Sequence, residues 1–173
     1  MSQQTENSMK KIFLAKVVLN MGVGKSGEPI EIGKKTLTQI TGKKPNTRNA
    51  KKSQRDWGVR KGEPIGVAIT VRNNDATELL KRLLIAKDNK ISGRAIDNEG
   101  NVSFGIKEHI DIPEIKYDPK IGILGLEVSL SLSRPGFSIK TRSNQKSKIG
   151  KTHRIAKNDT IKFLTEEFGV QIV

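Results

Sequence analysis

The sequence predicts an α+β fold: a single domain with a mainly antiparallel sheet, helices covering one face and two long basic loops. Within residues 121–133, Leu or Val stands at every second position from 124 to 132, which is typical of a strand with one buried face. Such alternation favours an antiparallel sheet over the continuously apolar strands of a doubly wound parallel sheet. Stripes of Leu and Ile elsewhere predict helices on the buried face, so the second face is left free for a ligand.

Length and composition agree with one domain. The 173 residues include only 34% hydrophobic and 4% aromatic residues, so the core must be aliphatic. We expect a disordered tail over residues 1–9 and one domain over residues 10–173. The polar opening MSQQTENS is unlike a secretory signal, and no apolar run is long enough for a membrane helix. The absence of Cys excludes disulfides and Cys-containing zinc sites and fits a reducing cytoplasm.

The first half of the chain predicts a strand, a helix and two more strands. Residues 12–19 are rich in β-branched and apolar side chains, as strands are. Residues 28–40 carry an early Pro and are followed by Gly42, which predicts a helix with its stop. Residues 45–50 and 65–72 read as strands. The fourteen residues between them form a long connection, and long loops in compact domains are usually functional.

The middle of the chain predicts one helix before the alternating strand. Asp75-x-x-Glu78 reads as a capping signal before a stripe of four Leu that packs on the sheet. Residues 91–117 are irregular except for a short extended piece over 102–106.

The end of the chain predicts one more helix and one more strand. Asn158-Asp159 is expected to cap a final helix that Gly169 stops, and residues 170–173 are expected to form an edge strand.

Positive charge is concentrated in two segments. The chain carries 32 Lys and Arg against 18 Asp and Glu, a net charge of +14. Residues 43–62, the first basic segment, hold eight basic residues and one acid, and residues 133–157, the second basic segment, hold eight and none. Both lack a helical period and contain Gly, Pro, Ser, Thr and Asn, which predicts loops or extended chain. Such loops suit the phosphates and riboses of structured RNA.

The candidate RNA-binding residues of the two segments are cations and one indole: Lys43, Lys44, Arg48, Lys51, Lys52, Arg55, Trp57, Arg60, Arg134, Lys140, Arg142, Lys146, Lys148 and Lys151. Trp57 is the only Trp. A lone Trp is most often a core residue, but its charged neighbours favour a loop tip, where the indole could stack on a base or ribose, and both readings stay open.

A glycine pattern raises the alternative of a nucleotide-binding enzyme. Residues 20–27, NMGVGKSG, contain the G-x-G-x-x-G spacing of a dinucleotide-binding turn and the GKS tail of a phosphate loop. The phosphate loop requires Gly where Leu19 stands, and the dinucleotide pattern requires an acid that residues 41–52 lack. Arg48 could meet a 2′-phosphate, which keeps an NADP-type reading as a minor alternative. A Gly-rich turn is the favoured reading.

Other catalytic and metal-binding patterns are weak. His109 and His153 stand far apart without a second His or Cys at ligand spacing. Four acids between residues 108 and 118 alternate with apolar residues, as on a solvated strand or turn edge. We therefore predict a protein that is not an enzyme, with no catalytic residue, metal or cofactor. A polybasic membrane-surface protein would use an amphipathic basic helix, which is not evident.

Five ordered blocks resemble a known family. They are VVLNMGVG (17–24), ITGKKPNTRNAKKS (40–53), RKGEPIGVAITVR (60–72), VSFGIKEH with IPEI (102–115) and RPGFSI (134–139). Their order and spacing resemble the universal ribosomal protein L-five family of 5S rRNA-binding proteins. The resemblance covers nearly all of residues 10–172. The long second basic segment, followed by a helix, looks like the archaeal and eukaryotic branch.

The resemblance implies a structural constituent of the large ribosomal subunit, cytoplasmic in location, that binds 5S rRNA and attaches it in the central protuberance. It also implies contacts with 23S rRNA, the P-site tRNA, other large-subunit proteins and a small-subunit head protein across an inter-subunit bridge. No membrane partner is implied.

Single positions carry over from the family as expectations. Asn20 matches the RNA-contacting Asn, Gly22 lies in the same glycine-containing turn, and Thr70 matches a polar residue on the strand after the basic loop. Lys43 stands where many bacterial members have Gln, so a phosphate contact is expected there. Residues 49–61 correspond to the loop near the tRNA, although Trp57 is not the usual bacterial residue.

Overall fold

A five-stranded antiparallel sheet forms the centre of the protein. The computed structural model describes residues 7–24, 26–115, 119 and 122–173. The strand order is β2-β3-β1-β6-β5, and every neighbouring pair is antiparallel. The strands are β1 (Phe13–Gly22), β2 (Asn46–Asn49), β3 (Pro64–Val71), β5 (Asn101–Ile106) and β6 (Leu126–Ser133). The predicted α+β class and the antiparallel sheet are confirmed.

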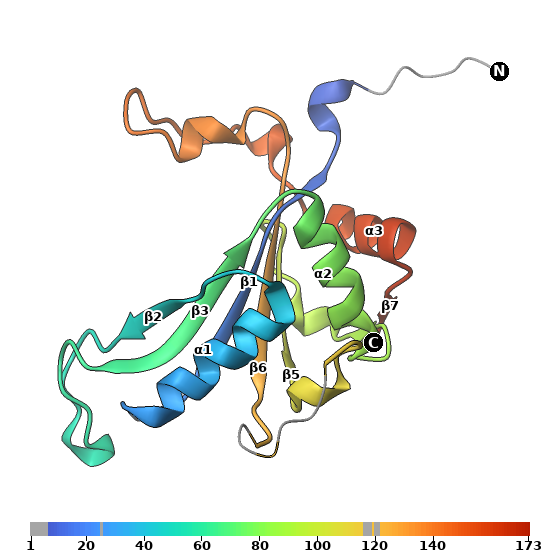
Figure 1. Cartoon of the computed structure of the whole chain (residues 1–173). Helices are drawn as coiled ribbons and strands as arrows, with labels where there is room; N and C mark the ends of the chain where they lie inside the picture. Colours follow the sequence, from blue (N-terminus) through green and yellow to red (C-terminus); the bar gives the residue numbers. More distant parts are fainter. Residues whose placement is uncertain (1–6, 25, 116–118, 120–121) are drawn as a thin grey trace.

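Two helices lie on one face of this sheet (Figure 1). α1 (Glu28–Thr41) packs against β3, and α2 (Asn74–Ile85) packs against β1. α3 (Lys157–Phe168) follows the second basic segment, and a separate parallel pair joins β4 (Lys90–Ile91) to β7 (Gln171–Ile172). No helix in the described part of the chain is long and apolar enough to cross a membrane.

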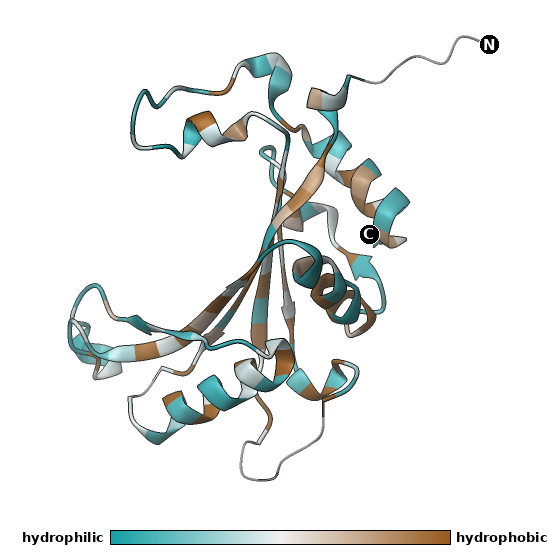
Figure 2. Ribbon diagram, turned by 45° about the horizontal axis from the view of Figure 1, so that its top comes forward, coloured by the Kyte–Doolittle hydropathy of each residue, from teal (hydrophilic) through white to brown (hydrophobic). Residues whose placement is uncertain are grey.

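The core lies between the sheet and the helices. Buried and partly exposed residues alternate along β1 and β6, so that Leu19 and Leu130 point inward beside Leu37 of α1 and Leu80 of α2. Figure 2 shows brown apolar segments along the central strands and on the helices. Burying each such Leu contributes about 1.5–3 kcal/mol relative to an exposed position. The opposite face of the sheet receives neither α1 nor α2.

Several element boundaries differ from the sequence predictions. β1 continues through Gly22, three residues beyond the predicted end, because Met21 and Gly22 still pair with β3. β6 begins at Leu126 and not near residue 121, and Ile121 itself lies outside the described residues. The predicted strand at the chain end exists, but β7 pairs with β4 and does not join the main sheet.

The helix cap predicted from the sequence was wrong for α2 and correct in part for α3, where Asp159 takes part in the N-terminal cap. Asn73 precedes α2 without a capping hydrogen bond, and Asp75 lies inside the first turn, where its charge favours the helix dipole. Ala156 precedes α3, and the Asp159 carboxylate accepts a hydrogen bond from the Ala156 amide at 3.4 Å. The two glycines that were predicted to end helices do so, since Gly42 and Gly169 adopt left-handed conformations directly after α1 and α3.

Short 3-10 turns lie in several of the described connections. They are Ser8–Lys10, Arg55–Trp57, Gly93–Ala95, His109–Asp111, Phe137–Lys140 and Lys151–His153. Asp118, the last of the four acids noted in the sequence, lies outside the described residues, as do residues 1–6 of the expected tail. The extent of that tail stays a prediction.

Candidate nucleic-acid interface

The face of the sheet without α1 and α2, here the uncovered face, carries small and polar side chains. Its residues are those that alternate with the core residues: Lys16, Val18, Asn20, Gly22, Asn46, Arg48, Gly66, Ala68, Thr70, Asn101, Ser103, Gly105, Glu127, Ser129 and Ser131. The register sets them in rows. Asn20 pairs with Glu127, and Val18 lies between Thr70 and Ser129. Asn20 and Thr70, predicted from the family resemblance, therefore share one surface.

The uncovered face is hollowed at its β5 side. A cavity of about 400 Å³ is lined by Lys16, Ser103 and Ser129, among others. Ser131 Oγ donates a hydrogen bond to Asn101 Oδ1 at 2.8 Å, and Asn101 Nδ2 donates to Asp97 Oδ2 at 2.8 Å. The amide of Asn101 lowers the pKa of Asp97.

These serines and asparagines were missed by the sequence reasoning. The signal was present in LEVSLSLS, since the alternation that identified buried Val and Leu also places Glu127, Ser129 and Ser131 together on the opposite face.

Two paired glycines flatten the uncovered face beside Arg48. Gly22 pairs with Gly66, and Arg48 pairs with Gly66 from the other side. A Cβ added to Gly66 would lie 3.0 Å from the Met21 carbonyl oxygen, so a larger residue here would crowd the backbone of β1. A Cβ added to Gly22 would meet nothing within 4 Å. The fold does not need Gly22, and its bare backbone is open to close approach by a ligand.

The first basic segment is an ordered extension of β2 and β3. Gln54 and Val59 exchange backbone hydrogen bonds of 2.8 and 3.1 Å, and Gly58 turns the tip with a φ of 64°. Trp57 stands at this tip with 79% of its surface exposed. Of the two readings left open by the sequence, the loop tip is confirmed and the core position is wrong.

All eight cations of the first basic segment are exposed. One of them, Lys43, forms an ion pair with Asp75 at the start of α2. The hydrogen bond from Lys43 lowers the pKa of the Asp75 carboxyl. No acid of the described residues forms an ion pair with the other seven, which are Lys44, Arg48, Lys51, Lys52, Arg55, Arg60 and Lys61.

In the described part of the glycine-rich turn after β1, two backbone amides already have partners within the protein. The amides of Val23 and Gly24 both donate to the Ile65 carbonyl, at 3.0 and 2.9 Å, and so are not free to cradle a phosphate. Ser26 Oγ donates to Glu63 Oε1 at 2.6 Å, and this bond, with one from the Arg60 amide, lowers the pKa of Glu63. Lys25 lies outside the described residues. These hydrogen bonds join the turn to β3 and to Glu63, which directly follows the first basic segment.

The second basic segment folds into a small lobe. Arg134 holds it, because its guanidinium donates to the carbonyls of His153 and Arg154 and pairs with Asp159 at 2.9 Å. The side chain of Arg134 is only 11% exposed. Phe137 and His153 pack edge to face, with ring centroids 5.5 Å apart. Arg134 therefore points inward, unlike the other candidate cations of this segment.

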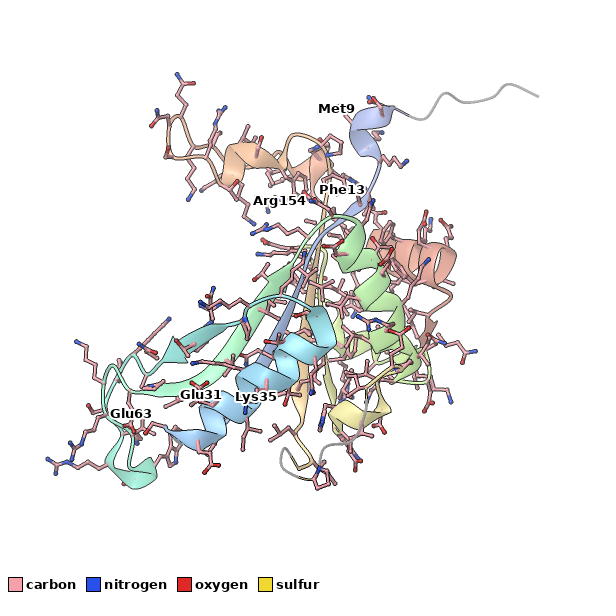
Figure 3. All side chains as sticks on the ribbon, viewed as in Figure 1. Met9, Phe13, Glu31, Lys35, Glu63 and Arg154 are labelled. Atoms are coloured by element: carbon pink, nitrogen blue, oxygen red, sulfur yellow. The ribbon has the colours of Figure 1, made fainter. Side chains whose placement is uncertain are left out.

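The outer surface of the lobe is cationic. Lys140, Arg142, Lys146, Lys148 and Lys151 are exposed, and Lys140 pairs with Glu99 at 3.1 Å. The first and second basic segments leave opposite ends of the sheet and both project away from α2 and α3 (Figure 1). Figure 3 shows side chains projecting from both segments, with Glu63 labelled near the base of the first segment and Arg154 in the second.

The two histidines serve the fold. His109 is 1% exposed, and its Nδ1 accepts a hydrogen bond from the Leu124 amide at 3.4 Å. His153 Nε2 lies 2.9 Å from the Pro135 carbonyl oxygen within the second basic segment. Among the described residues, no group of three or more His, Asp or Glu could hold a metal ion.

Comparisons with known proteins give a consistent match along the chain. Residues 7–60 match the family described as ribosomal protein L5, and residues 64–168 match the model that describes the C-terminus of this ribosomal family. The chain is 63% identical to the large ribosomal subunit protein uL5 of Nitrosopumilus maritimus, over 99% of both chains. It is 57% identical to the uL5 of Cenarchaeum symbiosum, over 95% of this chain and 98% of that protein. It is 44% identical to the uL5 of Nanoarchaeum equitans, over 97% of this chain and 99% of that protein.

Proposed function

The chain belongs to the ribosomal protein L5 family, whose members are structural and not enzymatic, and from that membership we propose that it binds 5S rRNA and attaches it in the central protuberance of the large subunit. The two family matches divide the sequence between residues 60 and 64, but β1 of the first pairs with β3 and β6 of the second. Both parts therefore act as one binding unit.

One observation carries the proposal: a polar uncovered face with small side chains stands between two cationic projections. Amide and hydroxyl groups such as those of Asn20, Thr70 and Ser129 suit ribose hydroxyls and base edges. Lys and Arg on the projections suit the phosphates on either side of that contact. The arrangement favours a large, folded RNA over a mononucleotide, because the cations are spread over the length of the sheet.

The candidate residues divide into three roles in this proposal. The uncovered face contributes Asn20, Gly22, Arg48 and Thr70. The first basic segment contributes phosphate contacts from Lys43, Lys44, Lys51, Lys52, Arg55 and Arg60. The second contributes Lys140, Arg142, Lys146, Lys148 and Lys151, which Arg134 positions from within.

The remaining partners follow from the two projections. We assign the tip at Trp57 to the P-site tRNA, since an exposed indole on a cationic loop can stack on a base or ribose. The second basic segment is assigned to 23S rRNA. Contact with a small-subunit head protein and with other large-subunit proteins completes the proposal.

Binding of the full chain to folded 5S rRNA, in magnesium and over 50 to 200 mM salt, tests the proposal. With six to ten phosphate contacts, affinity is expected to fall by about 10³ to 10⁵ over that range. A generic RNA duplex of equal length serves as the competing ligand. Equal affinity for both RNAs at 200 mM salt contradicts the proposal.

Matched variants locate the contact. Replacing Lys51 and Lys52 by Ala removes two exposed cations of the first basic segment and is expected to reduce the slope of log K against log salt by about 1.8. Replacing Lys81 of α2 and Lys162 of α3 removes the same charge from outside both basic segments and is expected to leave the slope nearly unchanged.

A further inference from the structure

A cavity of about 480 Å³ opens between the second basic segment and the turn that precedes β5. Its volume falls within the range of about 300–1,000 Å³ typical of small-ligand clefts. Phe137, Ile149 and Ile155 give it an apolar lining, while Lys146, Lys148 and Arg154 also line it. An apolar pocket edged by cations fits a flat ring that carries a phosphate.

The turn at Gly100 supports the apolar lining of the cavity. Ile155 is 1% exposed, and a Cβ added to Gly100 would lie 3.1 Å from its side chain. The Gly100 carbonyl accepts a hydrogen bond from the Leu132 amide at 2.8 Å, which fixes this turn to β6. Ile155 therefore packs closely against this turn at the floor of the cavity.

The cationic side is also held by the backbone. The Ser147 amide donates to the Ile139 carbonyl at 3.1 Å, and Arg154 Nε donates to the Ile149 carbonyl at 3.3 Å. Glu99 is the only acid among the described lining residues, and Lys140 pairs with it at 3.1 Å. The net charge of the lining favours an anionic occupant.

We propose that this cavity receives one unpaired nucleotide of the bound ribosomal RNA, with its base against Phe137 and Ile149 and its phosphate at Lys146 and Lys148. The inference rests on the proposed function and adds a nucleotide subsite to it. Single-stranded loops and bulges supply such nucleotides, because their bases can leave the stack and lie against apolar or aromatic side chains.

Blocking the cavity tests the inference. Ser147→Trp places an indole at the opening, Ser147→Ala keeps it open, and Ser143→Trp adds the same indole to an exposed position of the same segment that does not line the cavity. The probes are full-length 5S rRNA and the large-subunit rRNA, each mapped by 2′-hydroxyl reactivity with the full chain bound. Circular dichroism checks that each variant is folded.

The expected result is one unpaired nucleotide whose reactivity changes with the wild type, Ser147→Ala and Ser143→Trp but keeps its free value with Ser147→Trp. Affinity should fall about tenfold for Ser147→Trp alone. Identical footprints and affinities for the two Trp variants overturn the nucleotide subsite and leave the proposed function standing. Absence of any wild-type footprint on either RNA overturns both.

Discussion

Asn20 Nδ2 donates a hydrogen bond to Glu127 Oε2 at 3.1 Å, from β1 to β6 across the uncovered face. Glu127 is the one carboxylate among the described strand residues of that face. It orients the Asn20 amide but also places a negative charge beside the proposed path of RNA phosphates. These two effects oppose each other, and their balance can be measured.

We predict that Glu127→Gln strengthens 5S rRNA binding by about two- to fivefold at low salt, since it removes a repulsive charge and keeps an acceptor for Asn20. The gain should shrink as salt rises. Filter binding at several salt concentrations measures the effect, with Glu166→Gln on α3 as the charge-matched control. Weaker binding by Glu127→Gln would show that the carboxylate is needed to orient Asn20.

Gly22→Ala is expected to separate stability from RNA binding. No atom lies within 4 Å of the added methyl group, so the free energy of unfolding should stay the same or rise by up to about 1 kcal/mol. RNA affinity should fall several-fold, because the methyl group stands on the uncovered face. Gly66→Ala, which meets the Met21 carbonyl oxygen, should instead lower stability. Urea unfolding and RNA titration of both variants provide the measurements.

Trp57→Ala is expected to leave folding intact and to weaken tRNA binding. Because Trp57 is 79% exposed, the free energy of unfolding should change by less than about 0.5 kcal/mol. Urea unfolding followed by circular dichroism measures it. Large subunits assembled with the variant should bind P-site tRNA about 5- to 100-fold more weakly, while Trp57→Phe should retain most of the affinity. Unchanged tRNA affinity for Trp57→Ala would remove the indole from the contact.

The Lys43 and Asp75 pair makes a prediction about acid stability. Lys43 lowers the pKa of Asp75 in the folded state, so the pair stabilises the fold above the ordinary Asp pKa of about 3.9 and loses this contribution as pH falls through the lowered value. Lys43→Met should raise the pKa of Asp75 toward its ordinary value. Carboxyl NMR titration measures this shift. The pKa of Glu31, which Lys34 lowers, serves as the internal control and should not move.

Arg134 is expected to stabilise the fold and not to contact RNA directly. Arg134→Met removes the hydrogen bonds to the His153 and Arg154 carbonyls and leaves Asp159 without its partner. Unfolding free energy should fall by about 1.5–3 kcal/mol, against less than about 0.5 kcal/mol for Lys151→Met. If Arg134→Met leaves the free energy of unfolding unchanged but reduces the slope of log K for RNA binding against log salt, the Arg134 guanidinium contacts a phosphate instead.

The sheet was predictable where local pattern decides structure. Alternation identified β3 and β6, and Gly42 and Gly169 identified the helix ends, because each signal lies within a few residues of its effect. The end of β1 was not predictable in this way. Met21 and Gly22 stay extended because Val67 and Gly66 pair with them from a distant part of the chain.

The candidate interface was predictable in its charge and less so in its shape. The two basic segments follow from residue counts, and the polar face of β6 could have been read from the same alternation as its core face. The inward turn of Arg134 depends on Asp159, which lies 25 residues further on, so composition alone placed it with the exposed cations.

The place of β1 between β3 and β6 also sets the order in which the protein can fold. The hydrogen bond between Asn20 and Glu127 spans 107 residues, so β1, made first, waits for most of the chain before its second edge is paired. Contacts of such separation slow folding, because loop closure must precede the stabilising contacts. A nascent chain that ends before β6 can pair β1 with β3 but leaves the other edge of β1 open, and such an open edge favours aggregation.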